Sequence, residues 1–370
     1  MSVVIPIVVA FDDNYCIPAG VSLYSMLEHA KKERDNQKLF YKIHCLVDHL
    51  SVENTEKLQQ TIACFSHFSS IEFLDISAHQ SSCVASIEPS VTDKINQAFS
   101  QLNIYAKTRF SKMVVCRLFL ASLFSPYEKI LMFDVDTLFL NDISESFFIP
   151  IEEYYFGATK DFSSPKSLKH FHNIREKTPR ATFSLYEHYL AKEDLQIILE
   201  HNYNVGFLIV NLKLWRVDNL EKRLMDLVYQ KGQSVFCPEQ DILTLASYKK
   251  VLVLPYIYNT HPYMIHNQSF IPNQQEIVML HFYFDRKPWI LPTSPCSKEW
   301  HDTLLNTPFC AEYSMRFLKQ VTEALSLKNK QQSFEFLLPI LNVKTLIEYI
   351  FFGFNKLLAR LKNKLTKTYN

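Results

Sequence analysis

Two carboxylates, Asp134 and Asp136, directly follow the apolar run at residues 129–133 and are separated only by Val135. Such a run is typical of a buried strand, so both acids are expected where that strand leaves its sheet. Ligands of open α/β sheets bind at this carboxyl edge. Carboxylate oxygens suit a hard divalent cation such as Mn²⁺ or Mg²⁺, which often carries phosphates. The pair is therefore a candidate site for a metal and a diphosphate.

A histidine and a lysine late in the chain add to this candidate. Side chains i and i+2 of a regular strand share a face, so both acids could reach one cation. His281 follows the apolar residues 277–280, and a neutral imidazole could be a third ligand. Lys287 could reach a phosphate as a point charge. The alternatives are a solvated strand end, a hydrogen-bonded core histidine and a solvated lysine.

The hydrophobic pattern predicts the scaffold that must position these side chains. Strands are predicted at residues 3–10, 43–47, 71–76, 129–133, 154–160, 203–211, 251–254 and 277–281. Helices are predicted at residues 20–32, 111–124 and 212–230, and from residues 51 and 238 onward. The alternation of strands and helices indicates an α/β fold with a mostly parallel sheet covered on both faces. The polar residues 162–200 predict a lid or acceptor-side insertion.

Composition excludes several classes of protein. The 370 residues, 48% of them apolar, are enough for one large domain with an appendage. A net charge of +1 gives no global field toward nucleic acid. With only 5 glycines the chain has no glycine-rich phosphate loop, and it has no G-x-S-x-G motif of a hydrolase. Scattered cysteines and the lack of a signal-peptide pattern indicate a cytoplasmic protein.

The C-terminal residues 341–370 have a different character. From residue 342 on they hold six basic residues and one acid, and apolar residues recur among them at helical spacing. A basic amphipathic helix of this kind lies on an anionic membrane surface. The alternative is a helix docked on its own domain. The membrane interpretation predicts a peripheral protein on the inner face of the cell membrane.

Five motifs occur in the order seen in glycosyltransferase family 8, over residues 3–290. They lie at residues 10–15, 133–136, 202–211, 239–241 and 281–289. Within that family the chain most resembles the bacterial lipopolysaccharide glucosyl- and galactosyltransferases. The resemblance implies a GT-A fold, which is a Rossmann-like mixed sheet flanked by helices. It also implies Mn²⁺-dependent, retaining transfer of hexose from UDP-glucose or UDP-galactose.

The resemblance also implies a role for each matching residue. The metal ligands would be Asp134, Asp136 and His281. The positions around the nucleotide sugar and its metal are Ala10, Asp12, Asn14, Asp134, Val135, Asp136 and Lys287, with the first three at the uridine and Lys287 at the diphosphate. The positions expected to act on the transferred sugar and the acceptor are Arg117, Asp161, Asn204, Glu239 and Gln240.

Two positions depart from the family pattern. Glu239 stands where the family usually has aspartate, and one added methylene moves the carboxylate, which is expected to alter sugar choice. Phe284 stands where the family has a glycine that permits close backbone approach to the diphosphate.

The expected organisation is a catalytic domain at residues 1–290, a helical extension at 291–340 and a basic membrane-associating helix at 341–370. The expected acceptor is a lipid-linked oligosaccharide such as the lipopolysaccharide core, and no nucleic-acid partner is expected. One alternative is glycogenin-like glucosylation of a protein or primer. Another is a non-catalytic protein that binds a glycan or nucleotide sugar.

Overall fold

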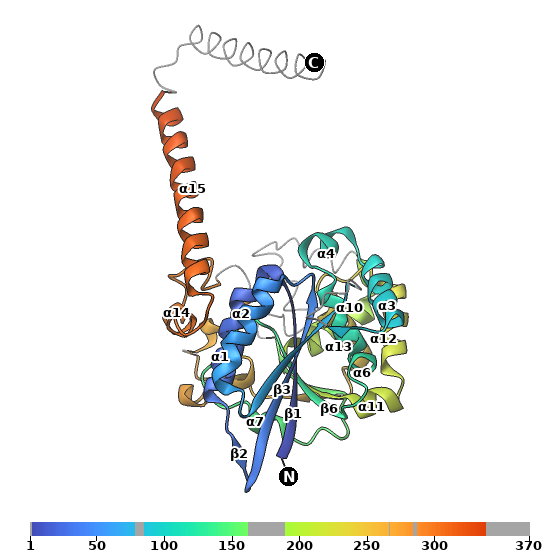
Figure 1. Ribbon diagram of the computed structural model, residues 1–370. Coiled ribbons are helices and arrows are strands. Elements are labelled where there is room, and N and C mark those ends of the chain that lie inside the picture. The colour runs from blue at the N-terminus through green and yellow to red at the C-terminus, as the bar shows by residue number, and fades with distance from the viewer. Residues whose placement is uncertain (1, 78–84, 162–188, 266, 284–286, 338–370) are drawn as a thin grey trace, which may run out of the picture. The chain divides into compact units, whose positions relative to one another are not determined.

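The computed structural model describes residues 2–77, 85–161, 189–265, 267–283 and 287–337 (Figure 1). The chain divides into two compact units, residues 1–311 and 312–370. Two predicted segments lie wholly or mostly outside the described residues. The basic helix predicted at 341–370 lies wholly outside them. Of the insertion predicted at 162–200, only the part from residue 189 on is described. Phe284 also lies outside the described residues.

The first unit is built around one sheet with the strand order β10-β8-β9-β6-β1-β3-β4-β5, in which β2 pairs with β3. Its strands are β1 (Ser2–Asp12), β2 (Glu33–Arg34), β3 (Gln37–Asp48), β4 (Ser69–Asp75), β5 (Ala85–Ser86), β6 (Lys129–Phe133), β8 (Phe156–Lys160), β9 (Tyr203–Asn211) and β10 (Val251–Val253). β1 runs parallel to β3 and β6, whereas β9 is antiparallel to β6 and β8. The predicted α/β class with a mostly parallel, mixed sheet is confirmed.

Helices cover both faces of this sheet, and α1 and α2 lie on the other side from α3, α6, α11 and α12 (Figure 1). The helices of this unit are α1 (Cys16–His29), α2 (Val52–Ile62), α3 (Pro89–Ser100), α4 (Ile104–Arg109), α5 (Met113–Cys116), α6 (Leu120–Leu123), α7 (Ser144–Phe147), α10 (Lys192–His201), α11 (Leu212–Val217), α12 (Leu220–Lys231), α13 (Pro238–Ser247) and α14 (Ser297–Leu304). Val8 packs in one core with Ile95 of α3 and Leu224 of α12. Its neighbours Ile7 and Val9 are equally buried, because the central strands are covered on both sides.

Two predicted helices differ from the structure. The helix expected at 111–124 is three short pieces, α5, the 3-10 turn η3 (Arg117–Phe119) and α6. The helix expected at 212–230 is two helices, because Asn219 adopts the left-handed region with φ of 49°. Asparagine tolerates that conformation, so helical spacing alone did not reveal the break.

The strand predicted at 277–281 is not part of the main sheet. As β11 (Met279–His281) it pairs antiparallel with β7 (Thr137–Phe139) in a separate two-stranded sheet. In this register His281 lies opposite Thr137. The backbone N–H of Phe282 also donates to the carbonyl oxygen of Asp136 at 2.8 Å. This small sheet therefore carries the histidine to the two acids.

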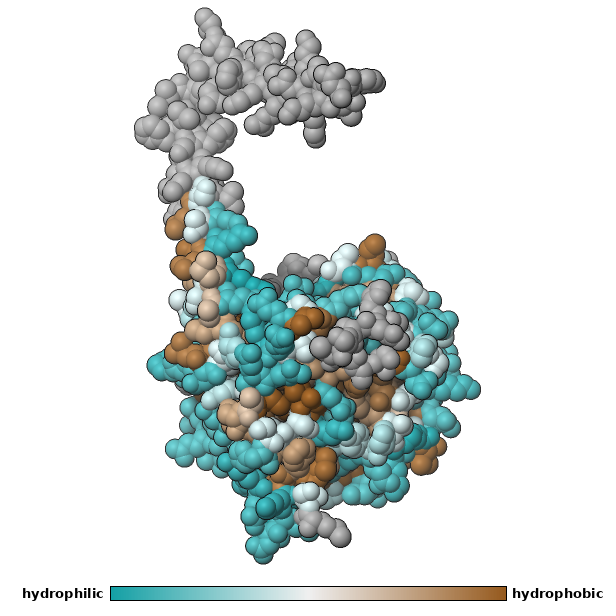
Figure 2. All heavy atoms as spheres, in the orientation of Figure 1, coloured by the Kyte–Doolittle hydropathy of each residue, from teal (hydrophilic) through white to brown (hydrophobic). Residues whose placement is uncertain are grey.

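The second unit follows the start of the long helix α15 (Cys310–Leu337). Apolar side chains on one side of this helix are exposed, among them Met315, Leu318 and Leu325 (Figure 2). Across the described part of the chain, helices fall short of the length and apolarity needed to cross a bilayer.

Candidate metal centre

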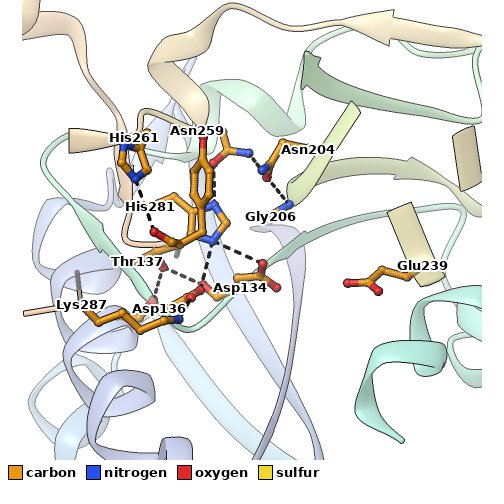
Figure 3. A network of polar contacts seen from close by, with 12 residues as sticks. Asp134, Asp136, Thr137, Asn204, Gly206, Glu239, Asn259, His261, His281 and Lys287 are labelled. Atoms are coloured by element: carbon orange, nitrogen blue, oxygen red, sulfur yellow. Dashed lines mark hydrogen bonds and ion pairs between the residues drawn. The ribbon is translucent and has the colours of Figure 1, made fainter. Parts of the chain in front are cut away.

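Asp134, Asp136 and His281 surround one point at the carboxyl end of β6 (Figure 3). One ligand atom of each side chain lies within 4.8 Å of the others. His281 Nε2 is 3.4 Å from Asp134 Oδ2 and 3.1 Å from Asp136 Oδ1. The structure thus brings together residues that are separated by 145 positions in the chain.

The two acids lie in a bend directly after the end of β6, where the sequence predicted them to leave the sheet. β6 stops at Phe133, and the chain turns through Asp134, Val135 and Asp136 before β7 begins. The Thr137 hydroxyl donates to the carbonyl oxygen of Asp134 at 2.7 Å and holds the bend closed. Val135 is buried, whereas the two carboxylates stay partly accessible.

Each carboxylate divides its two oxygens between His281 and an internal cation. Asp134 Oδ1 accepts from the guanidinium of Arg117, and Asp136 Oδ2 lies 2.5 Å from Lys287 Nζ. The remaining oxygens, Asp134 Oδ2 and Asp136 Oδ1, face His281. Two carboxylate oxygens and one imidazole nitrogen form a donor set that fits Mn²⁺ or Mg²⁺. The outer cations hold the carboxylates so that these three atoms converge.

Charge pairing is strong enough to overcome burial at this centre. Burial alone favours the neutral acid, but the positive charge of Lys287 outweighs it and holds the pKa of Asp136 well below its ordinary value. Burial also disfavours the charged Lys287, yet Asp136 and Tyr15 raise the pKa of this lysine. Asp136 is therefore ionised, as a metal ligand must be.

Glu239, at the first turn of α13, lies on the other side of Asp134 from Lys287 (Figure 3). Arg117 links the two acids, since its Nη1 is 3.5 Å from Glu239 Oε1. Glu239 Oε2 and Arg117 Nε are buried and have no hydrogen-bond partner among the residues that the structure describes. Burial raises the pKa of Glu239 to about 7. Two such polar atoms beside the acid pair are suited to hydroxyl groups of a ligand.

The predicted uridine residues lie where β1 meets the turn η1 (Asp13–Tyr15). Ala10 and Asp12 end the strand, and Asp12 Oδ1 accepts from the backbone N–H of Asn14 at 3.0 Å. Tyr15, which the motif analysis did not single out as a site residue, connects this edge to the metal centre. Its hydroxyl is 3.4 Å from Lys287 Nζ.

The ammonium of Lys287 lies over two aromatic rings, 5.4 Å from the ring centre of Tyr15 and 5.3 Å from that of Trp289. The sequence signal for Tyr15 and Trp289 was their presence in the two motifs that also hold Asn14 and Lys287. Both rings therefore position the lysine.

Two further predicted residues, Asp161 and Gln240, both contact Asn202. Gln240 Nε2 donates to Asn202 Oδ1 at 2.7 Å, and the N–H of Asp161 donates to the Asn202 carbonyl at 3.0 Å. Burial, followed by the charge of Asp161, raises the pKa of Tyr283, whose ring is 4.7 Å from that of His281. Asp161 and Gln240 thus share one anchor.

Gly206 permits His281 to reach the acids, and this predicts the effect of one added methyl group. A Cβ at residue 206 would overlap the His281 ring and lie 2.9 Å from Asn204 Oδ1. We expect Gly206→Ala to weaken Mn²⁺ binding at least about 10-fold in isothermal titration calorimetry, because the imidazole must move. Gly157→Ala is the matched control, since its Cβ meets only the Leu254 side chain at 3.2 Å or more. Equal metal affinities in the two variants would contradict the prediction.

Glu239 predicts a specific pH dependence of stability. Its pKa is raised from 4.5 to about 7 on folding, so the folded protein binds this proton more tightly than the unfolded chain. Stability from this group is therefore present at low pH and lost as pH rises through 7. Glutamine cannot ionise. Relative to wild type, Glu239→Gln should gain about 3 kcal/mol in unfolding free energy between pH 4.5 and 8. Urea denaturation of both proteins at several pH values tests this, and parallel curves would refute it.

Comparisons with known proteins identify similar glycosyltransferases. The curated relative GlyA, a glycosyltransferase of Streptococcus pneumoniae serotype 4, is 25% identical over 193 residues, which are 51% of this chain and 23% of GlyA. The bifunctional glycosyltransferase WbbM superposes with a TM-score of 0.60 at 20% identity, over 85% of this chain and 52% of WbbM. The chain spans about a quarter of GlyA and half of WbbM.

A second similar structure is the galactosyltransferase LgtC, solved with donor and acceptor sugar analogues. It superposes with a TM-score of 0.57 at 17% identity, over 82% of this chain and 96% of LgtC. At such identities these structures show the fold, which is the predicted GT-A fold. The sequence profile of glycosyl transferase family 8 matches residues 6–291. This match covers most of the chain and includes both acids and the histidine, so the protein belongs to glycosyl transferase family 8.

Proposed function

We propose that this glycosyltransferase moves glucose or galactose from a UDP-sugar to a lipid-linked oligosaccharide, with retention at the anomeric carbon and with Mn²⁺ or Mg²⁺ bound. The observation that carries the proposal is the convergence of Asp134, Asp136 and His281 at the carboxyl edge of the sheet. A divalent ion there supplies Lewis-acid stabilisation of the diphosphate that leaves. The nucleotide sugar is the ligand class that such an edge receives in this fold.

The protein's own groups account for the remaining charge on the leaving diphosphate. Lys287 can exchange its ion pair with Asp136 for one with an incoming phosphate, because Asp136 Oδ2 and the phosphate are alternative anions for its ammonium group. Tyr15 and Trp289 keep that ammonium at the site in either case. The residues proposed to hold the uridine lie at the end of β1 and in the turn that follows it, and they are Ala10, Asp12 and Asn14.

The sugar is proposed to lie between the metal centre and α13. Glu239 Oε2 and Arg117 Nε, both buried and without partners among the described residues, are suited to hydrogen-bond its hydroxyl groups. Asp161, Asn204 and Gln240 are proposed to line the space toward the acceptor. Gln240 is an amide and a poor nucleophile, which favours attack of the acceptor from the same face as the leaving diphosphate.

The lipid-linked acceptor is proposed from the C-terminal part of the chain, with the lipopolysaccharide core as the expected example. The exposed apolar side chains of Met315, Leu318 and Leu325 precede a tail that carries six basic residues. Apolar side chains followed by positive charge suit a surface of anionic lipid. We infer a peripheral location on the inner face of the membrane, where a lipid-linked acceptor is at hand.

Metal dependence and the role of the acids can be tested together. Release of UDP from UDP-glucose and UDP-galactose should require Mn²⁺ or Mg²⁺ and stop with EDTA. Asp134→Asn should lower turnover at least about 100-fold, more than the usual loss at residues that only support metal ligands. Asp302→Ala, in an exposed pair with Lys298, is the control and should keep full activity. Turnover that persists in EDTA would contradict the metal-dependent mechanism.

Membrane association has its own test. Removal of residues 343–370 deletes six basic residues and should release the protein from vesicles of anionic phospholipid into the supernatant on sedimentation, because the electrostatic attraction is lost. Raised salt should release the intact protein in the same assay. Unchanged sedimentation of the shortened chain would argue against the membrane role.

A further inference from the structure

We infer that Asn259, which lies outside every motif of the sequence, is a positioning residue that fixes which ring nitrogen of His281 carries the proton. The inference rests on the proposed metal centre. Asn259 is linked to His281 on one side and to Asn204 on the other (Figure 3). All three side chains are buried, with exposed fractions of 3% for Asn259 and His281 and 8% for Asn204.

The chain of hydrogen bonds starts at a group that can only be a donor. The backbone N–H of Gly206 can only donate, and it lies 2.9 Å from the side-chain amide of Asn204. The Asn204 atom that faces Gly206 must therefore be the oxygen, Oδ1. This assignment removes the usual ambiguity between oxygen and nitrogen in a side-chain amide.

The same oxygen faces Asn259 at 2.8 Å. Since an oxygen of an amide can only accept, Asn259 must present its nitrogen, Nδ2, as the donor. The other end of the Asn259 amide is then the oxygen, and it lies 2.9 Å from His281 Nδ1. That oxygen cannot donate, so Nδ1 of His281 carries the hydrogen.

In the neutral ring, which is the form that binds a metal, the single N–H is then on Nδ1 and Nε2 of His281 is left with its lone pair. This lone pair faces Asp134 Oδ2 and Asp136 Oδ1, which are lone-pair donors as well. Three such atoms without a proton among them repel one another and are stabilised by a cation. The opposite tautomer would satisfy both acids with an Nε2–H, and a metal would first have to displace that proton.

The backbone around Asn259 is fixed to the strand that carries His281. Thr260 N–H donates to the Met279 carbonyl at 2.9 Å, and His281 N–H donates to the Thr260 carbonyl at 2.9 Å. Asn259 itself follows the turn η4 (Tyr256–Tyr258) and donates its N–H to the Tyr256 carbonyl at 2.9 Å. The amide is therefore held in place before any ligand arrives, as preorganisation of a metal ligand requires.

The tautomer can be observed without metal, substrate or turnover. Long-range ¹H–¹⁵N spectra of the full chain with labelled histidine, assigned by comparison with His281→Gln, report which ring nitrogen is protonated. We expect the Nδ1–H form for His281 at a pH where its ring is neutral. A dominant Nε2–H form in wild type overturns the inference, whether or not any variant folds.

Two nearly isosteric substitutions separate positioning from packing. Asn259→Asp keeps an acceptor for Nδ1–H but loses the donor to Asn204 Oδ1, so we expect Mn²⁺ affinity in calorimetry to fall clearly less than in Asn259→Leu. Asn259→Leu removes the acceptor, and we expect about 10- to 100-fold weaker binding together with a shift toward the Nε2–H form. Asn306→Leu, at an exposed asparagine after α14, is the control.

The outcomes separate this inference from the proposed function. Equal losses of affinity in Asn259→Asp and Asn259→Leu mean that the side chain only fills space, and the inference fails. If wild type does not bind Mn²⁺ at all, the proposed metal centre fails, while the histidine spectra still decide whether Asn259 sets the tautomer.

Discussion

The register between β7 and β11 is the constraint on which the site depends. The main sheet delivers the two acids to its carboxyl edge, but it cannot deliver His281, whose strand lies outside it. Only the pairing of His281 with Thr137, with the Phe282 N–H on the Asp136 carbonyl, places the imidazole beside both carboxylates. A slip of one residue would turn the histidine to the opposite face of this small sheet. The bend at the acids and the small sheet are thus one unit.

The two acids of this unit are each paired with a basic side chain. Two partly buried carboxylates, Asp134 and Asp136, lie beside Arg117 and Lys287, so their negative charges are balanced within the protein. Each cation also extends the site, since Arg117 reaches Glu239 on α13 and Lys287 reaches the rings after β1. The same contacts that lower the cost of burying the acids therefore connect the metal position to the surfaces proposed for sugar and nucleotide.

Much of the fold could be predicted from the sequence because buried strands here are nearly continuous apolar runs. The residues of β6 and β9 matched their predicted ranges for that reason. Features set by contacts between distant segments could not be predicted. The 3-10 turn that presents Arg117 lies within a stretch of uniform helical spacing, and β11 looks like any other core strand.

The candidate site, too, could be predicted from the sequence only in part. The five motifs pointed to the acids, His281 and Lys287, because chemistry demands particular residue types there. Asn259 carries no such signal, since an asparagine between tyrosine and threonine is unremarkable in sequence. Its place follows only from a hydrogen-bond chain that starts in β9 and ends in β11.

The order in which β7 and β11 are synthesised determines when the site can form in a nascent chain. β7 emerges early and stays without its partner until residues 279–281 follow, more than a hundred positions later. A nascent chain thus holds the two acids but lacks His281, so the proposed metal site is complete only once nearly all of the first unit has left the exit tunnel. A divalent ion bound at the proposed site would consequently stabilise the finished fold and not its unfinished forms.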